Sequence, residues 1–172
     1  NFVYANSITQ NMRGISLYLS NSNTIRLNQI INNMDDGILF TNSSNNAIYK
    51  NNITHNTLGV ALWNSTGNRF YHNNFMLNGE GQAYIATSGD TDFWDNGYAS
   101  WGNYWSDYDG NDFNLDGVGD SSYVVDEHNQ DDYPLMEPWS TPENETIIIG
   151  TLHDYGILDP ADARYYSSLD LF

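Results

Sequence analysis

The chain has 172 residues, enough for one domain with a sizeable core, and a formal net charge of −17. Residues 1–80 are nearly neutral, whereas residues 81–172 hold nineteen of the 22 acidic residues and a single basic one, Arg164. This imbalance argues against nucleic acid and against anionic membrane surfaces, which are both recognised through basic patches. Cysteine is absent, which excludes disulfides, thiolate metal sites and a cysteine nucleophile, and no apolar run is long enough to span a membrane.

Residues 1–91 are dominated by a repeat with a period of 22 or 23 residues, seen in residues 14–30, 37–53 and 59–75. Each copy opens with a glycine, at Gly14, Gly37 and Gly59, and more weakly at Gly81. Four apolar positions recur in register: Ile15/Ile38/Val60, Leu17/Phe40/Leu62, Ile25/Ile48/Phe70 and Ile30/Ile53/Phe75. Three asparagine positions and one serine position also recur: Asn23/Asn46/Asn68, Asn28/Asn51/Asn73, Asn33/Asn56/Asn78 and Ser20/Ser43/Ser65.

Short alternating apolar stretches broken by Asn, Ser or Gly predict short strands joined at tight corners. Strands of this kind stack into coils, with apolar residues on the inside and ladders of asparagine at the corners. We also expect asparagine to supply the left-handed backbone that corners need. The sequence therefore predicts an all-β fold, a right-handed single-stranded parallel β-helix of about three to four coils. A leucine-rich solenoid lacks support because the L-x-x-L-x-L pattern is missing. Residues 1–3 match the middle of a repeat, so we expect the chain to begin in mid-coil, as a truncated solenoid.

Residues 92–139 are predicted to form a cap on the last coil, and their first part is rich in aromatic residues. Trp94, Trp101 and Trp105 allow two interpretations. Exposed on a flat surface, they would bind sugars by stacking; buried, they would close the open end of the solenoid. The second interpretation is favoured because the repeat ends here.

The stretch 112–120, DFNLDGVGD, follows within the cap and has the spacing of a calcium loop. Calcium takes carboxylate, amide and backbone carbonyl oxygens. The candidate ligands are Asp112, Asn114, Asp116, Val118 (through its carbonyl) and Asp120. The twelfth position is Tyr123 rather than the glutamate of an EF-hand, so the expected role is a structural calcium that braces the end of the coil. The alternative is a solvated acidic turn.

Residues 102–136, GNYWSDYDGNDFNLDGVGDSSYVVDEHNQDDYPLM, closely resemble the C-terminal signature of the NosD-like family. The upstream repeats agree with this resemblance, which covers residues 1–139. It implies an exported, periplasmic or cell-surface β-helix protein of archaeal type. The resemblance also raises copper as a cofactor, because founding members of the family are accessory proteins for copper loading of nitrous oxide reductase.

The residues themselves give copper little support. Copper prefers imidazole and thioether ligands, and the best candidates, His55 and His72, do not recur as a pair at metal spacing. Catalysis on a polysaccharide would need acidic side chains spaced across one face. Asp35 and Asp36 are neighbours in one coil without partner acids in the adjacent coils. We therefore expect no catalytic residues and no enzyme activity, although a polysaccharide-active β-helix with its active coils outside this sequence remains an alternative.

Residues 140–145 have the composition of a linker. Residues 146–172 resemble the mature N-terminus of family 5 extracellular solute-binding proteins, with a strand at Ile147–Ile149 and a helix start at Asp159-Pro160. This resemblance implies the start of a second domain and an association with an ABC transporter. Together, the sequence predicts a non-enzymatic, exported module whose partner is a glycan or a surface protein, with a copper accessory protein or a solute-receptor fusion as alternatives.

Overall fold

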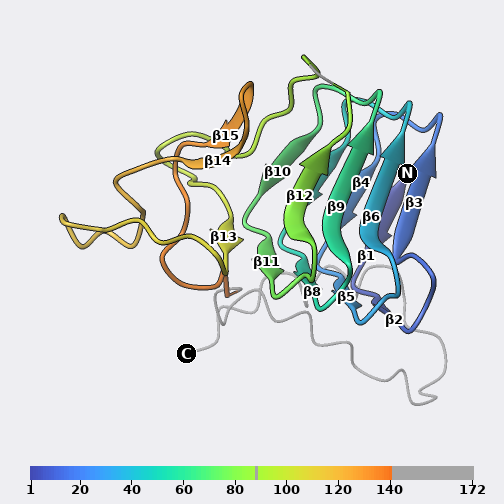
Figure 1. The fold of residues 1–172 in the computed structure, drawn as a ribbon, viewed down its shortest axis with the longest axis horizontal. Helices are drawn as coiled ribbons and strands as arrows, with labels where there is room; N and C mark the ends of the chain where they lie inside the picture. The colour runs from blue at the N-terminus through green and yellow to red at the C-terminus, as the bar shows by residue number, and fades with distance from the viewer. Residues whose placement is uncertain (88, 141–172) are drawn as a thin grey trace, which may run out of the picture. The chain divides into compact units, whose positions relative to one another are not determined.

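A computed structural model describes residues 1–87 and 89–140 of the chain (Figure 1). These residues form a parallel β-helix of about four coils, followed by a cap. Each coil contributes one strand to each of three parallel sheets. The predicted β-helix is therefore confirmed. The predictions for residues 141–172, which include most of the linker and the solute-binding-like segment, lie outside the described residues.

The strands repeat in the same order in every coil. The first sheet contains β1 (Phe2–Tyr4), β4 (Thr24–Arg26), β7 (Ala47–Tyr49) and β10 (Arg69–Tyr71). The second contains β2 (Ser7–Thr9), β5 (Gln29–Ile31), β8 (Asn52–Thr54), β11 (Asn74–Met76) and β13 (Tyr104–Trp105). The third contains β3 (Ile15–Tyr18), β6 (Asp36–Thr41), β9 (Leu58–Trp63) and β12 (Gly81–Ile85). An antiparallel hairpin, β14 (Tyr123–Asp126) and β15 (Asn129–Asp131), belongs to the cap.

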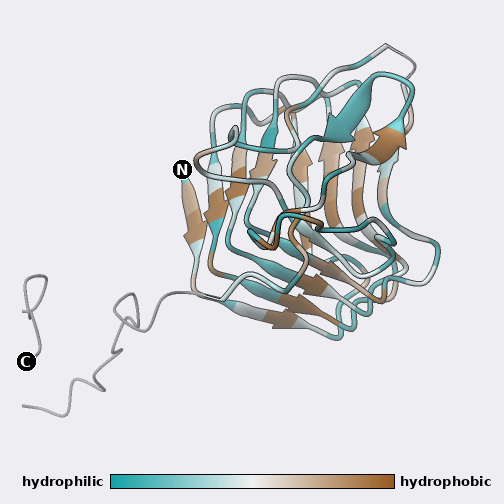
Figure 2. Ribbon diagram, turned by 90° about the vertical axis from the view of Figure 1, so that its left-hand side faces the viewer, coloured by the Kyte–Doolittle hydropathy of each residue, from teal (hydrophilic) through white to brown (hydrophobic). Residues whose placement is uncertain are grey.

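The four predicted apolar stacks form the core, and their members are partners in the sheet registers. Figure 2 shows the hydrophobic colour concentrated in the strands and the hydrophilic colour at the corners between them. Two of the stacks continue into the cap through stacked aromatic rings. Trp94 lies on Phe70, with ring centroids 4.4 Å apart, and Trp105 lies on Phe75 at 4.6 Å. The cap therefore extends the core rather than resting against its side.

The recurring glycine is explained by close approach of successive coils. A Cβ atom on Gly37 would lie 2.6 Å from the carbonyl oxygen of Gly59 in the next coil. Real Cβ atoms essentially never come so close to a carbonyl oxygen, so a larger residue here would force the coils apart. The repeat therefore keeps glycine at the entrance to the third sheet.

The three predicted asparagine ladders line the corners and run in one direction, whereas the exposed row of Gln29, Asn52 and Asn74 runs in the opposite direction. In the longest ladder, the Asn28 side-chain amide donates to Asn51 Oδ1 at 2.9 Å, and Asn51 donates in the same way to Asn73 at 2.9 Å. The backbone N–H of Asn28 shares the same acceptor on Asn51, at 3.0 Å. Each coil thus donates to the coil that follows it, and every ladder needs an acceptor at its C-terminal end.

The left-handed corner residues agree only in part with the prediction. Asparagine supplies the left-handed backbone at four corner positions, Asn32, Asn42, Asn45 and Asn64. The ladder asparagines themselves are not left-handed, and in most corners the residue immediately before each one is. Leu27, Lys50 and His72 form one such column, with φ between 56° and 58°, and His55 and Leu77 belong to another, with φ of 56° and 53°. Leu77 is 64% exposed whereas His72 is buried, so these columns accept residues in different environments and of types that disfavour this backbone conformation.

Candidate functional site

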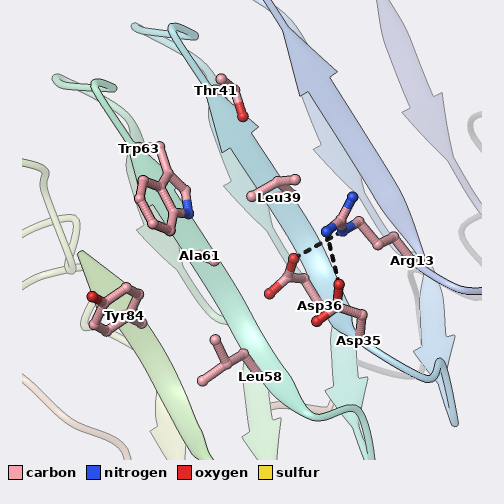
Figure 3. A pocket seen from close by; sticks show the side chains of 9 residues that line it. All are labelled: Arg13, Asp35, Asp36, Leu39, Thr41, Leu58, Ala61, Trp63 and Tyr84. Carbon is pink, nitrogen blue, oxygen red and sulfur yellow. Dashed lines mark hydrogen bonds and ion pairs between the residues drawn. The ribbon is translucent and has the colours of Figure 1, made fainter. Parts of the chain in front are cut away.

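The outer face of the third sheet carries a shallow groove, which we call the groove face (Figure 3). Inward residues such as Ile38 and Phe40 alternate along β6 with outward residues Leu39 and Thr41. The depression has a volume of about 370 Å³. Its lining residues are Arg13, Asp35, Asp36, Leu39, Thr41, Leu58, Ala61, Trp63 and Tyr84.

An aromatic pair stands at one side of this groove. Trp63, at the end of β9, is 51% exposed, and Tyr84 on β12 is 47% exposed. Their ring centroids are 6.3 Å apart and the rings are inclined by 64°. Ala61 and Leu39 lie between the aromatic pair and the charged residues, so the floor of the groove is apolar (Figure 3).

A charged cluster stands at the other side. Arg13 Nη2 lies 2.8 Å from Asp35 Oδ2, and Arg13 Nε lies 3.2 Å from Asp36 Oδ2. Asp36 is only 5% exposed, and burial followed by the charge of Asp35 raises the pKa of its carboxyl group, against the opposing influence of Arg13. The cluster offers planar hydrogen-bonding groups beside an aromatic wall, a combination suited to a polar ligand with an apolar face.

Two of the three tryptophans predicted as possible sugar-binding residues are not available for that role. Trp94 and Trp105 are 0% and 1% exposed, because they extend the core stacks. Trp105 Nε1 donates to Asp131 Oδ2 at 2.9 Å, which anchors the ring inside the cap. Trp101 is partly exposed and has a left-handed backbone, with φ of 65°.

The predicted copper ligands lie at different corners. His72 stacks on Trp139 with ring centroids 3.6 Å apart, and its Nε2 contacts the backbone carbonyl of Ser100. His55 is exposed, follows β8, and places Nδ1 2.8 Å from Thr54 Oγ1. Because His72 lies in the column of residues that precede the second sheet and His55 in the column that follows it, the two imidazoles do not form a common site. The geometry of these two residues does not fit a shared copper ion.

The predicted calcium loop is held by hydrogen bonds from its own backbone. Asp112 accepts from the N–H of Asp116 at 3.2 Å and of Gly117 at 2.9 Å, and Asp116 accepts from Val118 N at 2.9 Å. Asp120 accepts from Phe113 N at 2.6 Å, while Asn114 donates to Asp116 Oδ2 at 3.1 Å. Within residues 1–87 and 89–140, no three His, Cys, Asp or Glu side chains form a cluster able to hold a metal ion. Calcium binding therefore stays a prediction.

Sequence reasoning missed the aromatic half of the groove. The signal was present, because Trp63 lies in register with Thr41 and Tyr18, and Tyr84 with Ala61, on the outward row beside each apolar stack. The sequence shows Asp35 and Asp36 as adjacent acidic residues, but their ion pairs with Arg13 depend on how one coil lies above the next.

The fold and the ladders define a parallel β-helix protein with a closed C-terminal end. The sequence profile of the family described as "Periplasmic copper-binding protein (NosD)" matches residues 1–110, and the chain belongs to that family. Neither the search of curated proteins nor the search of solved structures gave a match. The described residues contain no helix long and apolar enough to cross a membrane.

Proposed function

We propose that this protein is an exported, periplasmic β-helix module that binds a neutral carbohydrate chain in the groove face, without cleaving it. The observation that carries the proposal is the pairing of the exposed Trp63 and Tyr84 rings with the Arg13–Asp35–Asp36 cluster across one apolar floor. Sugar rings present apolar faces to aromatic side chains and hydroxyl groups to carboxylates and guanidinium groups. The export assignment rests on the periplasmic description of the family.

The arrangement of the carboxyl groups supports binding without cleavage. Glycoside hydrolysis uses two carboxyl groups on opposite sides of the scissile bond, separated by roughly 5 to 9.5 Å. Asp35 and Asp36 are consecutive residues, and both are engaged by the same guanidinium group. This arrangement supports a binding role for them.

The test is affinity electrophoresis of the full chain through gels that contain neutral polysaccharides, one at a time. We expect retardation by at least one of them, and Trp63→Ala should weaken binding about tenfold or more, equivalent to about 1.4 kcal/mol. Tyr98→Ala is the control, because Tyr98 is 66% exposed and is not one of the residues that line the groove. Retardation unchanged in Trp63→Ala would sink the proposal. New reducing ends that disappear in Asp36→Asn would instead make the protein a glycoside hydrolase.

Copper handling is the second candidate, and the family description is what favours it. Titration with Cu(I) and Cu(II), followed by calorimetry, tests it directly. Submicromolar binding that is lost in His55→Ala or His72→Ala would support the candidate. Because the two histidines lie at different corners, we expect no variant pair to behave as ligands of one ion.

A further inference from the structure

The outer face of the first sheet gathers basic and aromatic residues on a strongly acidic protein. We call it the basic-aromatic face. The inward positions of β1, β4, β7 and β10 belong to the core, so the flanking residues of each strand point outward. The face consists of Tyr4, Arg26, Tyr49, Tyr71, Arg69 and Phe93.

Its side chains are ordered against one another. The rings of Tyr49 and Tyr71 stack with centroids 4.9 Å apart and an angle of 8°. Arg26 lies over the ring of Tyr4, with its guanidinium carbon 5.6 Å from the centroid. Arg69 lies 4.8 Å from the Phe93 centroid in the same manner. The face is therefore prepared for a ligand, because aromatic contacts already hold its cationic groups in place.

The basic residues of this face have no acidic partner on its own strands, although Arg69 donates to Asn96 Oδ1 at 3.1 Å. The strands β1, β4, β7 and β10 contain no acidic residue. Among the described residues, neither Arg26 nor Arg69 forms an ion pair with a carboxylate, whereas Arg13 on the groove face pairs with two. Arg26 and Arg69 are two of only five basic residues in a chain with a net charge of −17. Arginine and tyrosine are also the residue types enriched at the centres of protein interfaces.

The same chain carries a surface of opposite character in its cap. Residues 107–120, which we call the acidic loop, contain five aspartates and no basic residue. Phe113 and Leu115 project from this loop with 82% and 85% of their surface exposed. Large apolar side chains flanked by carboxylates complement a surface that combines aromatic rings with guanidinium groups.

We propose that the basic-aromatic face of one copy binds the acidic loop of a second copy, with Phe113 and Leu115 against the tyrosines and the loop aspartates beside Arg26 and Arg69. In the proposed arrangement each loop binds the face of a different copy, so the contact is head-to-tail and continues along a row of copies or closes into a ring. At 0.15 M salt the Debye length is about 8 Å, so repulsion between the acidic bodies is largely screened while contacts at shorter range persist. This inference does not depend on the proposed carbohydrate site.

The test is sedimentation velocity of the full chain at concentrations from about 10 µM to about 1 mM. This range detects association with dissociation constants of about 10 µM to 1 mM. A chelator is present throughout, so that no cation changes the charge of the loop. We expect the average mass to rise with concentration without a plateau at the dimer. Two variants each remove one surface: Arg26→Glu with Arg69→Glu removes the face, and Phe113→Lys with Leu115→Lys removes the loop.

Each variant alone should remain monomeric over the whole range, while an equimolar mixture should associate, because one partner retains the loop and the other retains the face. Glu127→Lys is the matched control: it changes the net charge by the same +2 as the loop variant, at an exposed residue outside both surfaces, and should associate like the wild type. Circular dichroism confirms that every variant is folded. A monomeric wild type at about 1 mM, or a mixture that sediments like its separate components, would overturn the proposal.

Discussion

Replacing Asp92 by asparagine should stabilise the protein at high pH and have little effect at low pH. Asp92 ends one of the corner ladders: its Oδ1 accepts from Asn68 N at 2.8 Å and from Asn68 Nδ2 at 3.1 Å. Its Oδ2 is buried and has no hydrogen-bond partner among the described residues. Burial raises the pKa of Asp92 from 3.8 to about 7. Asparagine keeps the Oδ1 acceptor and removes the buried charge.

The expected size and sign follow from proton linkage. Because the folded-state pKa of Asp92 exceeds the unfolded value, the folded state binds more protons between about pH 4 and 7, and the free energy of unfolding falls as the pH rises through this window. A rise of about 3 pKa units corresponds to about 4 kcal/mol at high pH. An unpartnered buried amide NH₂ costs about 1–3 kcal/mol. Asp92→Asn should therefore gain about 1–3 kcal/mol at pH 8 and about nothing at pH 5, where the wild-type carboxyl is protonated.

The assay is urea unfolding at pH 5, 6, 7 and 8, followed by the fluorescence of the buried cap tryptophans. Asp131→Asn is the contrasting variant, because both oxygens of Asp131 accept hydrogen bonds: Oδ2 from Asn103 N at 2.7 Å and Oδ1 from Tyr133 N at 3.1 Å. Asparagine would place an NH₂ group against one of these donors, so Asp131→Asn should be less stable than Asp92→Asn by about 1–3 kcal/mol. An Asp92→Asn effect that is equal at pH 5 and pH 8 would refute the reasoning.

Three further predictions concern the ladder, a corner and the cation loop. Asn51→Ala should cost about 3 kcal/mol or more in urea unfolding, because it leaves the N–H of Asn28 without its acceptor and removes the side-chain donor to the Ile25 carbonyl. A cost below about 1 kcal/mol would argue against the ladders as stabilising elements. Leu77→Asn should raise the free energy of unfolding by about 0.5–1 kcal/mol, because Leu77 has a φ of 53° and is 64% exposed, whereas Leu77→Val should lower it. If calcium braces the cap, a chelator should lower the melting temperature of the wild type and have no effect on Asp116→Ala; equal melting curves for the wild type with and without chelator would remove calcium from the description.

The core was predictable because, in a solenoid, residues that are one repeat apart in the sequence lie next to each other in successive coils. Ile25, Ile48 and Phe70 recur at one position of the repeat, and one period of the chain brings each directly above the last. The ladders were predictable for the same reason. The left-handed residues were only partly predictable. Asparagine holds some of these positions, such as Asn32 and Asn45, but one column holds Leu27, Lys50 and His72, which share no chemistry that signals a positive φ.

The groove was only partly predictable, because a binding surface depends on which outward residues share a face and not on their recurrence. Trp63 has Thr41 and not an aromatic residue as its counterpart one coil earlier, so the repeat does not mark it as part of an aromatic surface. A high local density of tryptophan is compatible both with a sugar-binding surface and with a buried cap. Here it reflects burial, because Trp94 and Trp105 are almost fully enclosed. The exposure of these cap residues depends on how the chain turns after the last coil, and the repeat does not predict that turn.

The direction of the three corner ladders determines where the solenoid can end. In the three corner ladders, each asparagine side chain donates one hydrogen bond to the ladder residue of the following coil, so a coil with asparagine at these positions can be followed by another such coil. A carboxylate accepts but does not donate, and the ladders of Asn68 and Asn103 end at Asp92 and Asp131. An aspartate at an asparagine position thus acts as a stop signal. A 23-residue coil inserted into the middle of this chain should continue the ladders, because its asparagines can both accept from the coil before and donate to the coil after. The same coil placed after Asp92 and Asp131 would receive no ladder hydrogen bond, because a carboxylate has no donor.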